Sequence, residues 1–163
     1  LTGLAGSLLA PVSTSGHVAQ LERLLDDMDR AATDADFAAF YLLNIDFHDV
    51  IVDATGNSRL IKMYRDLVKA FRLFRTHGLV AQDALMASNS EHRAIVEAIK
   101  SGDCRACYDV SFHHVANGKQ RMLIALDKLT AEGAAEVGQE NVVRVNRRNQ
   151  AVAARDAFRK TKK

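Results

Sequence analysis

The scarcity of proline is the feature that most restricts what this chain can fold into. A single proline, Pro11, occurs in 163 residues, so long stretches contain nothing that would break a helix. The 25 alanines, which have the highest helix propensity of any residue, point the same way. Apolar residues also recur every three or four positions, as at Leu60, Tyr64, Leu67 and Phe71. The sequence therefore predicts an all-α fold, an antiparallel bundle of six or seven helices with short connections.

Capping residues and the apolar pattern divide the chain into seven predicted helices. They cover residues 1–10, 13 or 15 to 29, 34 or 36 to 56, 57–77, 80–86, 88–100 and 104–131. The run from Ser88 to Glu91 has the spacing of a capping box, so we expect a separate helix to begin there. Beyond these helices the apolar periodicity is weak. We therefore divide the chain into a helical domain over residues 1–130 and a basic extension over 131–163 that could form a further helix.

Charge is unevenly distributed along a chain whose formal net charge is only +2. Residues 141–163 contain eight basic residues and one acid, a balance of +7, which leaves −5 for the other 140 residues. Such a basic end could contact phosphate, but it is more often simply solvated. The small total charge does not predict a polyanionic partner for the whole chain.

The composition also bears on where the protein acts. No run of about 18 apolar residues is present, so we expect no membrane span. Cys104 and Cys107 are too few to cross-link a domain of this size, which favours a reducing compartment, the cytoplasm. Because the chain begins with Leu1 in apolar, helix-like sequence, we expect it to be a piece of a longer protein whose N-terminal part is missing.

Three histidines on three predicted helices form the strongest candidate site. His48 follows Phe47 in the most apolar part of its helix, and His92 lies in the first turn after the predicted cap at Ser88. At 100° per residue, His114 falls on the edge of the inward stripe of its helix, whereas His113 faces outward. Imidazole nitrogens bind zinc, nickel or manganese, and each histidine could equally be a hydrogen-bonded core residue. Spacing alone leaves both interpretations open.

Other residues give weaker signals. Asn44 lies one turn before His48 on the same face and could add an amide oxygen or a hydrogen bond to the site. Arg75, with Arg72 beside it, could anchor a carboxylate or a phosphonate at the rim of a polar cavity, or could simply lie on the surface. The CxxC of residues 104–107 lacks the context of a redox or zinc motif and is better explained by small buried thiols. No phosphate-binding loop and no catalytic triad pattern is present, so we predict no catalytic residues.

An ordered series of short motifs resembles a known family. It comprises Phe47-His48, Ala54-Thr55-Gly56-Asn57, Ser88-x-x-Glu91-His92-Arg93-Ala94-Ile95, Ala98-Ile99 and Gly102-Asp103, followed eleven residues later by His114. Over about residues 1–127 the chain resembles the FCD domain, the C-terminal effector-binding domain of FadR-type regulators in the GntR superfamily. The resemblance implies an antiparallel helical bundle that binds a small organic acid and often a metal. It also implies a homodimer that binds operator DNA through a winged helix-turn-helix domain, which is absent from this chain.

The resemblance further implies a set of metal ligands. In the family these are an aspartate and a histidine four residues apart, the histidine of the Ser-x-x-Glu-His motif, and a histidine on the last core helix. They fall here on Asn44, His48, His92 and His114, with Asn44 in place of the aspartate. The site thereby loses one negative charge, so Asn44 would be a weak ligand or only a hydrogen-bond partner. Zinc is the first expectation for the metal, with nickel or manganese as alternatives.

Three functional hypotheses follow. The first is a ligand-sensing, dimerising domain of a bacterial transcriptional regulator, which is not an enzyme and which binds a small carboxylate or phosphonate through a divalent metal. The second is a metal-dependent hydrolase or lyase that uses the same three histidines, since three ligands plus an open position is also a catalytic arrangement. The third is a metal-free helical dimerisation module in which the histidines are core residues.

Overall fold

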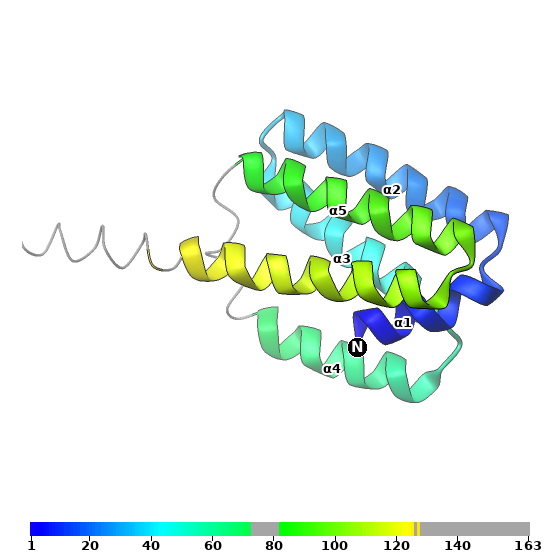
Figure 1. The fold of residues 1–163 in the computed structure, drawn as a ribbon. Helices are drawn as coiled ribbons and strands as arrows, with labels where there is room; N and C mark the ends of the chain where they lie inside the picture. The colour runs from blue at the N-terminus through cyan, green and yellow to red at the C-terminus, as the bar shows by residue number, and fades with distance from the viewer. Residues whose placement is uncertain (73–81, 126, 128–163) are drawn as a thin grey trace, which may run out of the picture. The chain divides into compact units, whose positions relative to one another are not determined.

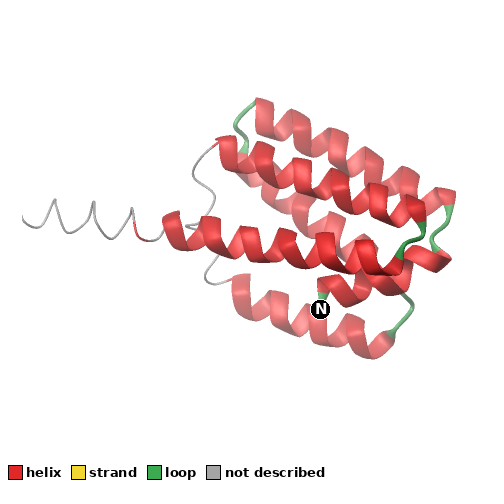
Figure 2. Ribbon diagram, in the orientation of Figure 1, coloured by secondary structure: helices red, strands yellow, loops and turns green. Residues whose placement is uncertain are grey.

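The computed structural model describes residues 1–72, 82–125 and 127, with the side chains of residues 70–72 and 82 left out. Every regular element in this part of the chain is a helix, which confirms the predicted all-α fold (Figures 1 and 2). The elements are α1 (Thr2–Leu9), the short 3-10 helix η1 (Ala10–Val12), α2 (Ser15–Thr33), α3 (Phe37–Asp53), α4 (Ser58–Arg72) and α5 (Gln82–Ser101). A further helix, called helix 104–125 below, covers residues 104–125.

The chain divides into two units, Leu1–Ala125 and Leu126–Lys163. Within the second unit the structure describes only residue 127. The basic extension predicted for residues 131–163 lies outside the described residues, as do the predicted end of α4 at residue 77 and residues 80 and 81. The predicted boundary near residue 130 therefore stays a prediction.

Capping side chains account for three helix starts. Asp36 Oδ1 accepts a hydrogen bond of 2.9 Å from the backbone N–H of Ala39, and Asn57 Oδ1 accepts one of 3.1 Å from Leu60, as the sequence predicts. The cap of α2 is Thr14 rather than the predicted Ser13 or Ser15. Its hydroxyl accepts from the backbone N–H of His17, whose Nδ1 accepts from the backbone N–H of Thr14, so a histidine takes the role usually played by glutamate.

The predicted helix start at Ser88 is wrong, because α5 runs without interruption from Gln82 to Ser101. Ser88 and Asn89 are buried inside this helix, with exposed fractions of 7% and 1%. The Asn89 amide donates to the backbone carbonyl of Leu25 at 3.0 Å and to the carboxylate of Asp29, both on α2. Glu91, the partner of Ser88 in the predicted capping box, instead binds His114, Asn117 and Arg121 on helix 104–125, so a tertiary contact overrides the local signal.

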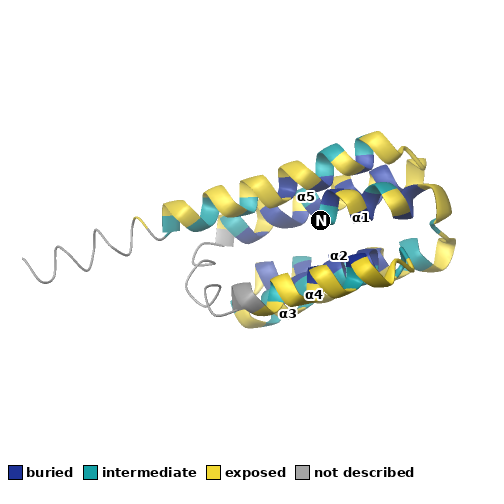
Figure 3. Cartoon of the chain, turned by 90° about the horizontal axis from the view of Figure 1, so that it is seen from below, coloured by how far each residue is buried: buried dark blue, intermediate teal, exposed yellow. Residues whose placement is uncertain are grey.

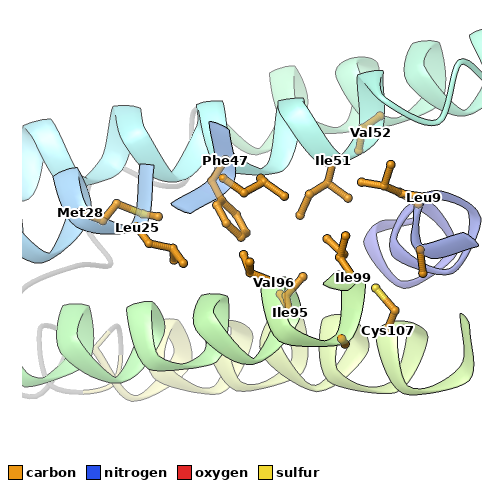
Figure 4. Close-up of a cluster of buried hydrophobic side chains, with 14 of the residues drawn as sticks. Leu9, Leu25, Met28, Phe47, Ile51, Val52, Ile95, Val96, Ile99 and Cys107 are labelled. Atoms are coloured by element: carbon orange, nitrogen blue, oxygen red, sulfur yellow. The ribbon is translucent and has the colours of Figure 1, made fainter. Parts of the chain in front are cut away.

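The hydrophobic core lies between the inward faces of the helices (Figure 3). α2 packs against both α3 and α5, α1 packs against α3, and α4 packs against α3. Figure 4 shows Phe47 and Ile51 on α3 pointing toward Val96 and Ile99 on α5. The largest fully buried apolar side chains are Phe40, Phe47, Leu9, Leu21, Met28, Ile51, Leu85, Ile95, Ile99, Val52 and Val96. This apolar packing fixes α3 and α5 face to face, and each carries one of the candidate histidines.

α1 and helix 104–125 approach closely through glycine. A Cβ placed on Gly6 would lie 2.8 Å from Sγ of Cys107 and 2.9 Å from Oγ of Ser111, which is closer than van der Waals contact allows. Cys107 is fully buried here, and burial raises the pKa of its thiol to about 11, so it is a packing residue. Cys104 is exposed, so the prediction of two buried thiols is correct for only one of them.

Candidate metal centre

The three candidate histidines come together in the interior, each from a different helix. His48 on α3, His92 on α5 and His114 on helix 104–125 have exposed fractions of 7%, 0% and 7%. Nε2 of His114 lies 3.2 Å from Nε2 of His48 and 3.1 Å from Nε2 of His92. One nitrogen from each of the three residues lies within 4.8 Å of the other two. Ring nitrogens from residues that are 22 and 66 positions apart along the chain therefore converge on one point in the interior.

Helical periodicity explains why these side chains face inward. Asn44, Phe47, His48 and Ile51 share the buried face of α3. The Phe47 ring packs against His92, with ring centroids 4.6 Å apart, and so forms an apolar wall beside the histidines. On helix 104–125, His114 is buried and His113 is exposed, as the helical geometry predicts. The His113 ring turns back to the carbonyl of Asp109, 2.7 Å from its Nδ1.

The electrostatics of the cluster favour a neutral imidazole at His92. Burial lowers the pKa of His92 well below its usual value, and the nearby His48, His114 and Arg121 lower it further. A neutral imidazole keeps a lone pair on one ring nitrogen, which is the form that binds metals. Nδ1 of His92 is buried and has no hydrogen-bond partner within the described part of the chain, so its polar atoms are not fully used by the protein.

The donor set and its spacing fit a divalent metal. Two nitrogens bound tetrahedrally to zinc at about 2.0–2.1 Å are about 3.3–3.4 Å apart, so a small outward movement of the imidazoles would admit the ion. The 3.1 and 3.2 Å separations here are only a few tenths of an ångström shorter. Three buried nitrogen donors with a fourth position left for another ligand suit zinc, nickel and similar borderline ions.

A carboxylate beside the cluster was not singled out from the sequence as a functional residue. Glu91 Oε2 lies 2.8 Å from Nδ1 of His114, and Asn117 Nδ2 donates to Oε1 at 2.9 Å. Arg121 donates from Nη1 and Nη2 to the two oxygens, each at 2.8 Å. Burial alone would raise the pKa of Glu91, but these hydrogen bonds outweigh it and lower the pKa to about 2. The 114, 117, 121 spacing places three of these residues along one stripe of their helix, but no spacing in the sequence links that stripe to Glu91.

The remaining predicted site residues are placed less fully. Asn44 is buried, with an exposed fraction of 6%, one turn before His48 on the same face of α3. Its role as a ligand stays a prediction. Arg72 ends α4 with its side chain outside the description, and Arg75 lies outside the described residues altogether. The predicted anchoring of an acid by these arginines is therefore also untested.

Comparison with known proteins places the chain in a family. The FCD domain model matches residues 1–117, well over half of the 163. No curated protein matches the sequence. Among solved structures, the chain is similar to E. coli McbR/YncC, with a TM-score of 0.64 and 19% sequence identity. The match covers 78% of this chain and 60% of that one, so the chain spans about three-fifths of the length of that protein.

None of the described helices is both long enough and apolar enough to cross a lipid bilayer. The family model, which matches more than half of the chain, shows the family, and the structural match shows a shared fold. The chain belongs to the FCD family, the effector-binding domains of GntR-family transcription regulators, which are regulatory rather than enzymatic.

Proposed function

We propose that this domain senses a small organic acid, a carboxylate or a phosphonate, by binding it to a divalent metal held by His48, His92 and His114. The observation that carries the proposal is the convergence of three buried imidazoles from three helices in a domain of this family. Zinc is the first expectation, with nickel and manganese as alternatives. The metal would supply a positive charge and an open coordination position for an anionic group.

The charge of the site supports an anionic ligand. All three histidines are neutral donors when they bind a metal, and Asn44 stands where the family has a carboxylate, so the charge of a dication is not balanced within this set. Glu91 is negative, but its charge is already paired with Arg121. A bound acid would therefore supply the missing negative charge. Arg75 and Arg72 remain candidates for holding its other end.

The position of the site suggests how binding is transmitted. A metal bound by these residues would tie together α3, α5 and helix 104–125, so binding of the acid would favour one packing of the three helices. In the full-length protein, this would alter the spacing of two DNA-binding domains in a homodimer and hence the affinity for operator DNA.

Family membership sets aside the hydrolase or lyase hypothesis. The metal-free dimerisation hypothesis stays open, and the surface offers a face suited to a second copy. Tyr108, Phe112 and Val115 lie on one face of helix 104–125 with exposed fractions of 40%, 56% and 48%. Phe112→Glu should increase the monomer fraction in light scattering if this face joins two protomers, whereas an unchanged mass would place the interface elsewhere.

Elemental analysis tests the metal proposal directly. The protein is purified without chelators and without a histidine tag, beside His92→Ala and the exposed control His113→Ala. We expect near-stoichiometric metal in the parent and in His113→Ala, and little in His92→Ala. Metal-loaded parent is then titrated with metal-chelating acids by calorimetry, where we expect saturable binding without turnover. A parent that purifies without metal and does not take up zinc, nickel or manganese would refute the proposed mechanism and favour the metal-free hypothesis.

A further inference from the structure

We propose that Glu91 and Arg121 are positioning residues of the metal centre: Glu91 fixes His114 in the metal-binding tautomer, and Arg121 holds Glu91 against His114. This inference rests on the metal site proposed above. It adds to that site two residues that do not themselves bind the metal.

The contact with Glu91 determines where His114 carries its proton. Glu91 Oε2 lies 2.8 Å from His114 Nδ1, and an ionised carboxylate can only accept a hydrogen bond, so the proton between them belongs to Nδ1. A neutral imidazole protonated at Nδ1 has its lone pair on Nε2. That atom is the one that lies 3.1 and 3.2 Å from the other two histidines. Glu91 therefore determines which nitrogen of His114 faces the centre.

Glu91 is itself held in place by Arg121 and Asn117. The two terminal nitrogens of Arg121 donate to the two carboxylate oxygens in a fork, each bond being 2.8 Å long. Asn117 fills a further position on Oε1, so each oxygen of Glu91 accepts two hydrogen bonds and the carboxylate cannot rotate away. The side chains of Glu91 and Arg121 are only 23% and 22% exposed, which shields the pair from water more than the surface ion pairs of this domain.

A positioning role for Glu91 and Arg121 differs from simple bracing of two helices in what it requires of His114. The network could join α5 to helix 104–125 whichever nitrogen of His114 carried the proton, but only the Nδ1-protonated form leaves Nε2 free to bind a metal. His92 receives no such help, because its Nδ1 has no hydrogen-bond partner within the described residues. The tautomer of His114 in the metal-free protein is therefore the property that distinguishes a positioning role from a bracing role.

The experiment combines that tautomer with zinc affinity. The tautomer is read from the ¹⁵N shifts of the histidine rings in chelator-treated protein, and the zinc Kd is measured by competition with a chromophoric chelator. The variants are Glu91→Gln, Arg121→Met and Arg121→Lys, with Glu97→Gln as a control. Glu97 is also on α5 and also bound to a cation, Lys100, but its side chain is 70% exposed. Thermal unfolding of each metal-free variant separates loss of metal affinity from loss of stability.

We expect His114 of the parent to carry its proton on Nδ1, and Glu91→Gln to weaken zinc binding about 10- to 100-fold. Arg121→Met should weaken it less, Arg121→Lys should recover part of the loss, and Glu97→Gln should match the parent. Proton placement on Nε2 of the parent His114 would overturn the inference, as would unchanged zinc affinity in Glu91→Gln and Arg121→Met. If Glu91→Gln does not fold, the zinc affinities of Arg121→Met and Arg121→Lys test the inference instead. A parent that binds no zinc overturns the metal site itself, which is a distinguishable result.

Discussion

A methyl group added at Gly6 should destabilise this domain, although alanine is the better helix former. The new Cβ would lie 2.8 Å from Cys107 Sγ and 2.9 Å from Ser111 Oγ. Both atoms belong to short side chains that are almost fully buried, with exposed fractions of 0% and 2%, so neither can turn out into solvent. The contact can be relieved only by moving α1 away from helix 104–125.

The size of the effect follows from two opposing contributions. Overpacking a buried contact costs about 1–3 kcal/mol, and two simultaneous overlaps place Gly6→Ala in the upper half of that range. Replacing a helical glycine by alanine returns about 0.5–1 kcal/mol. The net loss should be about 1–2.5 kcal/mol, which lowers a urea midpoint by roughly 0.5–1.2 M if the slope is about 2 kcal/mol per M.

Gly118 provides the matched control. It also lies inside a helix, but a Cβ there would meet only the Arg121 Nη2 atom at an ordinary 3.9 Å. Gly118→Ala should therefore stabilise the protein by about 0.5–1 kcal/mol. The assay is urea unfolding of both variants in the presence of a chelator. If both changed stability in the same direction and by the same amount, helix propensity alone would explain them, and the close approach of α1 to helix 104–125 would be refuted. Because Ser111 lies one turn before His114, Gly6→Ala should also weaken zinc binding.

Four further outcomes are expected. His114→Ala should abolish zinc binding and His113→Ala should leave it nearly intact, as measured by chelator competition; the reverse result would mean that helix 104–125 is wrongly oriented. Asn44→Asp restores a negative charge and should lower the zinc Kd, whereas an unchanged Kd would show that residue 44 does not contact the metal. The folded-state pKa of Glu91, about 2, lies below the ordinary value of 4.5. The contribution of its ionised carboxylate to stability should therefore be present above pH 4.5 and be lost as the pH falls toward 2. The free energies of unfolding of the chelator-treated parent and of Glu91→Gln should converge at low pH, and a constant difference between them across that range would contradict this. Zinc at a concentration of 100 times its Kd should raise the free energy of unfolding by about 2.7 kcal/mol. A chelator should reverse this increase, and His92→Ala should not show it.

The periodic features of this chain could be predicted from its sequence, because they depend only on the geometry of a helix. The 3.6-residue period was enough to place Asn44 and His48 on one face of their helix and to separate His114 from His113. The start of α3 could be narrowed to Asp34 or Asp36 and that of α4 placed at Asn57, because a cap involves residues only three positions away. These calculations require no knowledge of which helices are neighbours.

Features that depend on contacts between helices could not be predicted in this way. Ser88 and Glu91 have the spacing of a capping box, yet α5 continues through them, and Glu91 instead binds His114, Asn117 and Arg121 on another helix. Glu91 and Arg121 are 30 residues apart, and no local spacing marks them as partners. A strong local signal therefore fails where a tertiary contact uses the same side chain.

The segment from Asn89 to Arg93 shows why a short motif carries so much information in this fold. Its side chains leave α5 in three directions. Asn89 and Arg93 bind Asp29 on α2, Glu91 binds helix 104–125, and His92 enters the core between Phe47 and His114. The arginine contact is nearly half exposed and contributes little to stability, whereas the Glu91 network is largely shielded. The contact between α5 and helix 104–125 contains His114 of the centre and Glu91, the carboxylate that orients it. A ligand that draws His92 toward a metal must therefore change how α5 packs against helix 104–125.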